Sequence, residues 1–133
     1  IQKKMNRLIS FSLVIVTFLF SSLVFAGGHT KGMYIHIINF NITGIDRSQY
    51  EGGAMQATSA FAAVPGLKRK HWLANEENNT YGGVYIFDSK ESHDAFTESE
   101  LYAGVKGNPS FTNFSGKSFE NIDSLAKHTR GTE

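Results

Sequence analysis

The segment 33–42 (MYIHIINFNI) most constrains the fold of this chain. It is rich in β-branched and aromatic residues and contains neither glycine nor proline, which predicts a β-strand. Side chains alternate between the two faces of a strand, and both faces are largely apolar here. One carries Tyr34, His36, Ile38, Phe40 and Ile42, and the other Met33, Ile35, Ile37, Asn39 and Asn41. We therefore expect a strand that is covered on both sides.

An amphipathic helix is predicted to follow this strand. Its apolar residues are spaced four, three, four and three apart, at Tyr50, Ala54, Ala57, Phe61 and Val64. The segment 48–51 has the pattern of a capping box and indicates where the helix begins. Pro65 and Gly66 end it and turn the chain.

The second half of the chain repeats this alternation. Segments 67–75 and 81–88 are predicted strands, and the polar segment 76–80 joins them as a hairpin. A second capping box at 88–91 opens a helix with His93 and Phe96 on one stripe, and Ser99 can cap a separate short turn. The segment 111–122 contains the last strand, centred on 117–122, before a polar tail.

The order strand, helix, strand, strand, helix, strand predicts a fold of the α+β class. It is the order of the ferredoxin-like βαββαβ arrangement, with one four-stranded antiparallel sheet and two helices on one face.

Several residues in this framework resemble the YdhR-like mono-oxygenase family, a branch of the dimeric α/β-barrel superfamily. The resemblance covers about the middle third of the chain that follows the N-terminal signal described below. It rests on the spacing from 64–67 (VPGL) through Lys70, Trp72 and Asn75 to 82–87 (GGVYIF), followed by Ser92, Ala95 and Phe96. It implies a homodimer in which two sheets face each other as a barrel, with a pocket in each subunit between the sheet and its own helices. That arrangement would cover both faces of the 33–42 strand.

The first 26 residues predict a secretory signal and not a part of the fold. No charged residue occurs from 8 to 25, basic residues precede this run and small residues follow it. An uncleaved membrane anchor is the alternative, because 18 uncharged residues just reach the length that can span a bilayer. We expect a signal peptide with an upstream extension at 1–26, one domain at 27–133, and an exported protein that is periplasmic or secreted and leaves the membrane after cleavage.

Charge and cysteine content narrow the function. Removing residues 1–26 takes away Lys3, Lys4 and Arg7 and no acid, so 13 basic residues fall to 10 against 12 acidic ones. A net charge of −2 argues against nucleic-acid binding. The absence of cysteine excludes disulfides and thiolate metal ligands. The histidines lack paired spacing, so no metal site is expected, and no glycine-rich phosphate loop is present.

The resemblance implies oxidation of a small aromatic or quinol-type substrate by oxygen without a cofactor. Such chemistry needs a dry aromatic pocket and polar groups that hold a substrate anion. Catalytic residues cannot be singled out. The candidate substrate-binding residues are Trp72, Tyr85, His36, Phe96, His93 and Asn41, with Lys70 as an anion partner.

Each candidate also has a structural interpretation. A single tryptophan on a strand is more often part of a core, and Lys70 can be a solvated or interface lysine. His36 can be a hydrogen-bonded core histidine and His93 a surface residue. The resemblance to the wider superfamily, which includes haem-degrading relatives, also implies haem degradation as a minor alternative, and this would use Asn39 or Asn41 together with Trp72 and His93.

Two functions fit these observations. The first is an exported mono-oxygenase that acts without a cofactor, and the second is a non-catalytic domain of the same fold that binds a small apolar ligand or a protein partner.

Overall fold

The computed structural model describes residues 31–132, which form one sheet and its covering helices. The predicted signal at 1–26 lies outside the described residues. The elements, in chain order, are β1 (Lys31–Ile42), α1 (Arg47–Ala62), β2 (Leu67–Asn75), β3 (Thr80–Ser89), α2 (Lys90–Thr97), α3 (Glu100–Lys106), β4 (Phe111–Glu120), α4 (Asp123–Ala126) and the 3-10 turn η1 (Lys127–Thr129).

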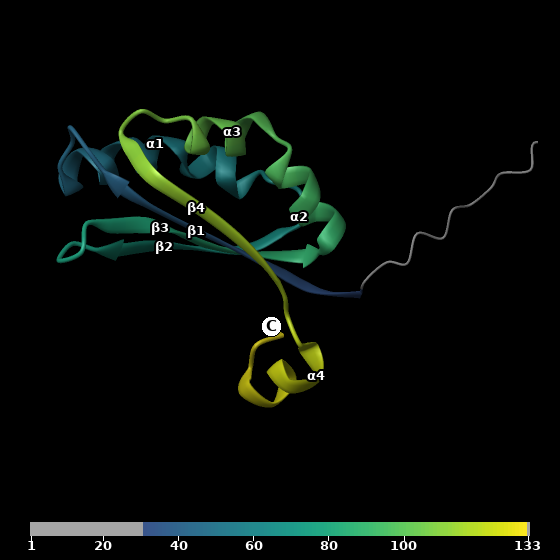
Figure 1. The fold of residues 1–133 in the computed structure, drawn as a ribbon. Helices are drawn as coiled ribbons and strands as arrows, with labels where there is room; N and C mark the ends of the chain where they lie inside the picture. The colour runs from purple at the N-terminus through teal and green to yellow at the C-terminus, as the bar shows by residue number, and fades with distance from the viewer. Residues whose placement is uncertain (1–30, 133) are drawn as a thin grey trace, which may run out of the picture.

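The sheet has the strand order β2-β3-β1-β4, and every neighbouring pair is antiparallel. The strand expected to be covered on both faces, β1, therefore lies between β3 and β4. Helices α1, α2 and α3 lie on one face of the sheet, and α4 lies on the other side at the C-terminal end (Figure 1). This confirms the predicted ferredoxin-like α+β fold, with the second helix of that fold divided into α2 and α3.

The cap of α1 differs from the predicted one. Asp46 is the N-cap, and its side chain accepts a hydrogen bond from the backbone nitrogen of Gln49 at 2.8 Å. The side chain of Gln49 accepts in return from the backbone nitrogen of Asp46 at 3.0 Å. The predicted box at 48–51 was wrong because aspartate and glutamine satisfy the same exposed N–H groups as serine and glutamate, two residues earlier.

Two further boundaries differ from the sequence expectations. Ser89, and not Asp88, caps α2, while Ser99 caps α3 as expected. The last strand is Phe111–Glu120, so it begins earlier than a strand centred on 117–122. A register shift between Asn39 and Asn41 and a left-handed backbone at Asn113 (φ 52°) mark a bulge in this pairing. The predicted polar tail contains α4 and η1.

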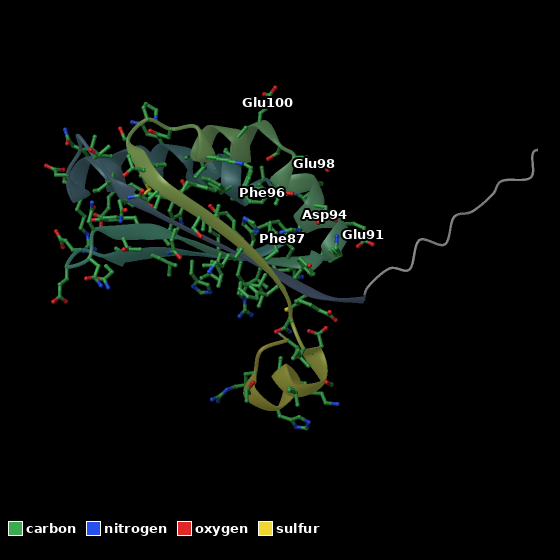
Figure 2. The ribbon with its side chains drawn as sticks, in the orientation of Figure 1. Phe87, Glu91, Asp94, Phe96, Glu98 and Glu100 are labelled. Carbon is green, nitrogen blue, oxygen red and sulfur yellow. The ribbon has the colours of Figure 1, made fainter. Side chains whose placement is uncertain are left out.

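The core lies between the sheet and the helices and is mostly aromatic. Its buried residues are Ile38, Phe40, Ile42, Tyr50, Phe61, Tyr81, Tyr85, Phe87 and Phe96. Figure 2 shows Phe96 directed inward from α2 near Phe87, whereas Glu98 and Glu100 extend outward; the two phenylalanine rings are 5.4 Å apart between centroids. The amphipathic pattern therefore fixes which helix faces meet the sheet.

The centre of the other face of the sheet is also apolar, and charged residues such as Arg69 and Lys117 flank it. Ile35 of β1 pairs with Ile86 of β3 and with Phe119 of β4, and Ile37 pairs with Val84, so these side chains share one face. The three covering helices lie on the opposite face (Figure 1). Phe119 is 46% exposed.

Within residues 31–132, no helix combines the length and the apolar character needed to cross a bilayer.

Candidate functional site

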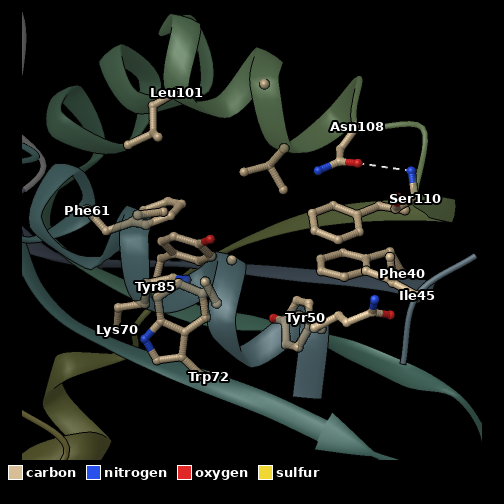
Figure 3. A pocket seen from close by; sticks show the side chains of 18 of the residues that line it. Phe40, Ile45, Tyr50, Phe61, Lys70, Trp72, Tyr85, Leu101, Asn108 and Ser110 are labelled. Atoms are coloured by element: carbon tan, nitrogen blue, oxygen red, sulfur yellow. Dashed lines mark hydrogen bonds between the residues drawn. The ribbon is translucent and has the colours of Figure 1, made fainter. Parts of the chain in front are cut away.

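A cavity of about 400 Å³ lies between the sheet and helices α1 and α3, and we call it the Lys70 cavity. Its sheet side is formed by Phe40, Lys70, Trp72, Gly82 and Tyr85. The helix side is formed mainly by Tyr50, Gly53, Ala54, Ala57 and Phe61 of α1 and by Leu101, Gly104 and Val105 of α3. Figure 3 shows the rings of Phe61, Tyr85 and Trp72 gathered around Lys70.

Small residues on the helices leave room for this cavity. A Cβ added at Gly53 or at Gly104 would meet no atom within 4 Å. The sheet side is the opposite case, because a Cβ at Gly82 would lie 1.8 Å from the backbone oxygen of Ile38. Gly82 also has φ +150°, a conformation that side chains rarely adopt. Only glycine fits at this point of the sheet.

The amine of Lys70 is enclosed by aromatic rings. Its Nζ lies 2.8 Å from the ring centroid of Trp72, 4.0 Å from that of Phe61 and 4.8 Å from that of Tyr85. Among the described residues, no carboxylate forms an ion pair with it. Burial away from water disfavours the ammonium form and lowers the pKa of Lys70 to about 7. Lys70 is therefore not the solvated lysine that the strand pattern favoured.

Two phenols of the cavity are kept neutral. Burial is the main cause that raises the pKa of Tyr50 to about 12, and Tyr81 and Glu51 add to it. The pKa of Tyr85 is also raised, first by burial and then by Tyr50 and Tyr102. At the far end of the cavity, Asn108 Oδ1 accepts a hydrogen bond from the backbone nitrogen of Ser110 at 2.9 Å (Figure 3). The cavity thus combines an aromatic wall, a polar end and one amine whose charge changes near neutral pH.

The structure brings together three of the seven residues predicted for the site. Lys70, Trp72 and Tyr85 line the cavity. Phe96 lies behind Tyr85, with 5.0 Å between ring centroids, and does not line it. Asn41 lies at the end of the sheet, where its Nδ2 donates to the backbone oxygen of Asn79 at 2.7 Å and its Oδ1 accepts from Asn113 Nδ2 at 2.7 Å.

The remaining two, His36 and His93, belong to a separate polar group that we call the histidine cluster: His36, His93, Asp94, Tyr102 and Ser118. His36 Nδ1 lies 3.0 Å from His93 Nε2 and 3.0 Å from Ser118 Oγ. His93 is 5% exposed, so it is not a surface residue, and His36 is 3% exposed. Burial, and then the neighbouring His93, lower the pKa of His36 to about 4.

The separation of the histidine cluster from the Lys70 cavity argues against the haem-degradation alternative. Trp72 lines the cavity, whereas His93 does not. Asn39 pairs with Gly82 and Ser115 on the face of the sheet away from the helices, the face of Ile35 and Ile37. The asparagine, tryptophan and histidine therefore do not converge on one site. Within residues 31–132, no group of three or more His, Asp or Glu side chains is arranged to hold a metal ion.

Sequence reasoning missed the helix side of the cavity. Tyr50, Ala54, Ala57 and Phe61 were identified as an apolar helix stripe, which indicates contact with the sheet but not an empty volume. The small side chains in that stripe and in α3 were the available signal. Ser118 and Tyr102 were not singled out, because nothing in their local sequence marks them.

Comparisons with known proteins give the same fold. A protein of unknown function from Nitrosomonas europaea superposes with a TM-score of 0.59 at 13% identity, covering 71% of this chain and 93% of that one. SnoaB, a cofactor-independent oxygenase from Streptomyces nogalater, gives 0.54 at 14% identity, covering 68% and 93%. A dimeric ferredoxin-like protein of unknown function from Thermobifida fusca gives 0.55 at 20% identity, also covering 68% and 93%. No curated protein matches the sequence.

The family assignment comes from the sequence itself. Residues 35–132 match the family described as "Putative mono-oxygenase ydhR", a stretch that extends from β1 to the end of the described chain. This span includes every element that forms the Lys70 cavity and confirms the resemblance seen around Lys70, Trp72 and 82–87. The chain belongs to the ydhR mono-oxygenase family.

Proposed function

We propose that this protein is a mono-oxygenase that acts without a cofactor on a small, flat aromatic substrate bearing an acidic hydroxyl, such as a quinol. The observation that carries the proposal is the amine of Lys70, which lies among three rings in a 400 Å³ cavity with a pKa of about 7. Membership of a mono-oxygenase family and the fold shared with a cofactor-independent oxygenase support it.

The chemistry begins with proton transfer. A phenolic substrate in contact with the neutral amine loses its proton to Lys70, and the resulting ammonium then stabilises the aromatic anion in the same place. An electron-rich anion of this kind reacts with O₂. One oxygen atom replaces two hydrogens of the substrate as a carbonyl, the other leaves as water, and the substrate supplies all the electrons. Exclusion of water by the aromatic wall strengthens the ammonium–anion pair.

We further propose that two copies assemble through the apolar sheet face that carries Ile35, Ile37, Val84 and Ile86, and that the protein acts after export. The dimer would cover the face that the helices leave open, and a related structure is described as dimeric. Sedimentation of the chain that begins at Gly27 should give a dimer at micromolar concentration. A monomer there, or an N-terminus of the exported protein far from Gly27, would contradict these two points respectively.

The oxygenase is tested by oxygen consumption with a panel of quinols and hydroxylated polycyclic aromatics. Lys70→Met keeps the length of the side chain and removes the base, so turnover should fall about 100-fold or more. The matched control is Lys68→Met, an exposed lysine on the same strand, which should retain turnover. Wild-type rates should rise as the pH increases through about 7, because only the neutral amine accepts the proton.

The alternative function is ligand binding without turnover, and the apolar lining of the cavity is the observation that favours it. Trp72 is the only tryptophan and lines the cavity, so its fluorescence reports occupancy directly. Quenching by the panel together with oxygen consumption at background for every compound would favour a binding domain and refute the oxygenase for those substrates.

A further inference from the structure

Three side chains outside the Lys70 cavity form a chain of hydrogen bonds. Asp94 Oδ1 lies 2.8 Å from His93 Nδ1, and His93 Nε2 lies 2.9 Å from Ser118 Oγ. Asp94 and His93 come from α2, and Ser118 comes from β4. An acid that orients an imidazole, which in turn contacts a hydroxyl, is the arrangement that activates serine nucleophiles.

The proton positions follow from the partners. A carboxylate only accepts hydrogen bonds, so His93 carries its proton on Nδ1 and presents a lone pair at Nε2. His36 Nδ1 faces that lone pair at 3.0 Å, so it carries a proton. His36 Nε2 then accepts from the hydroxyl of Tyr102 at 3.3 Å. The single N–H of His36 lies within 3.0 Å of both His93 Nε2 and Ser118 Oγ. When this N–H is directed to Ser118 Oγ, the lone pair of His93 Nε2 is left to accept the proton of Ser118 at 2.9 Å.

The surroundings hold this arrangement in place, and they leave Ser118 as its exposed member. Lys90 Nζ binds the second oxygen of Asp94 at 2.6 Å, which fixes the direction of the carboxylate. The absence of a side chain at Gly116 leaves room for Tyr102, since a Cβ there would lie 2.7 Å from the Tyr102 hydroxyl. Both imidazoles are buried, but Ser118 is exposed on the edge strand β4.

We propose that Ser118 is the nucleophile of a second, hydrolytic site for carboxylic esters, with His93 as general base, His36 as the donor to the oxyanion and Asp94 as a positioning residue. Ser118 Oγ bonds to the ester carbonyl carbon as its proton passes to His93 Nε2. The bond to the alcohol oxygen breaks, and His93 returns the proton to the departing alcohol. Water then attacks the acyl-serine, again losing a proton to His93, and releases the acid and free Ser118.

His36 suits the role of oxyanion donor. Its Nδ1 lies 3.0 Å from Ser118 Oγ, and the oxyanion is the former carbonyl oxygen on the carbon that becomes bonded to Oγ. The low pKa of His36 keeps the ring neutral at pH 7, with its proton on Nδ1 opposite the lone pair of His93 and with Nε2 accepting from the Tyr102 hydroxyl. The two histidines thus present opposite hydrogen-bonding groups to one serine: a lone pair from His93 and an N–H from His36.

A fluorophosphonate tests the proposal, because phosphorus reacts with an activated serine, fluoride leaves and the adduct is stable. Peptide mass spectrometry of the full chain after labelling should place the adduct on Ser118. Ser118→Ala should remove it, and Ser115→Ala, a serine of the same strand that pairs with Asn39 on the other face, should label like wild type. His93→Gln should lower the labelling rate by about 100-fold or more.

The positioning role of Asp94 is tested by the labelling rate, which a purely structural role would not change unless the fold were also destabilised. Asp94→Asn should lower the labelling rate about 10- to 100-fold while the urea midpoint stays that of wild type, and Asp94→Glu should restore part of the rate. Absence of an adduct on Ser118 in the folded wild-type protein overturns the proposal. An undiminished labelling rate in folded His93→Gln overturns it too. Neither result depends on oxygen consumption, so this proposal can fail independently of the oxygenase.

Discussion

The Lys70 cavity and the histidine cluster lie on either side of the packed rings of Tyr85 and Phe96, and each contains a buried base with a different environment. Lys70 is surrounded by rings and has no acidic partner among the described residues. In the cluster, both nitrogens of His36 and both of His93 have hydrogen-bonding partners. Burial lowers the pKa of Lys70 and of His36 alike. What differs is the partner, so the amine is available to a ligand, whereas the imidazoles are already oriented toward Ser118.

Phe96→Ala removes the ring that packs between Tyr85 of the cavity and His36 of the cluster, and it should have the largest effect. Phe96 is 2% exposed and its ring contacts those of Tyr85, Phe87, His36 and Tyr102. The free energy of unfolding should fall by about 3–5 kcal/mol, measured by urea denaturation. Met55→Ala is the control, because Met55 is 71% exposed and its loss should change stability little. A loss below about 1 kcal/mol for Phe96→Ala would show that the two regions do not depend on a common packed ring.

His36 should make the fold sensitive to acid. The pKa of His36 is about 4 in the folded state and about 6.5 in the unfolded state, so between these values the unfolded chain holds more protons. The contribution of neutral His36 to the free energy of unfolding is fully present above about pH 7 and falls by about 3 kcal/mol as the pH drops to 4. His36→Phe should lose this part of the pH dependence in urea titrations at pH 7, 5.5 and 4. His128→Phe, on the exposed turn η1, should keep it, and equal slopes in the two variants would contradict the prediction.

Lys70 should act in a different pH range. Its folded pKa of about 7 lies below the ordinary 10.5, so the unfolded chain binds more protons between these values and stability rises with pH across that range. Relative to Lys70→Met, wild type should gain about 1–2 kcal/mol from pH 7 to 10, allowing for partial solvent screening. Urea denaturation at three pH values measures the difference. A constant difference would mean that the amine stays charged in the cavity.

Tyr102→Phe should have the smallest effect. It removes the hydroxyl that donates to His36 Nε2 at 3.3 Å and leaves the ring contacts in place. We expect a loss of about 0.5–1 kcal/mol in the free energy of unfolding. Tyr34→Phe is the matched control at another partly buried tyrosine. A neutral Tyr102→Phe with unchanged fluorophosphonate labelling would indicate that His36 keeps its tautomer without this hydroxyl.

The elements were predictable where periodicity is strong and local. The second strand was predicted at 67–75 and is found there, and the apolar stripe from Tyr50 to Phe61 does face the sheet. Helix starts were not predictable to the residue, because Asp46 and Ser48, or Asp88 and Ser89, are equally good caps in sequence. The start of β4 was missed because its first half, 111–116, contains the bulge and few β-branched residues.

The site was only partly predictable for a related reason. Alternation along β2 placed Lys70 and Trp72 on one face, but the sequence did not indicate which face meets the helices. The contact between His36 and His93 joins residues 57 positions apart. It depends on how α2 lies over β1, which no local pattern encodes. Ser118 joins them from a third element, so the cluster becomes visible only once the sheet is assembled.

Gly82, Gly53 and Gly104 determine where substitutions can alter the ligand selectivity of this cavity. The strand side is fixed, because any side chain at Gly82 would collide with the backbone of β1. The helix side accepts added methyl groups without displacing a neighbour. Descendants or engineered variants can therefore acquire new selectivity through substitutions in α1 and α3, while the sheet that carries Lys70 and Trp72 is inherited unchanged.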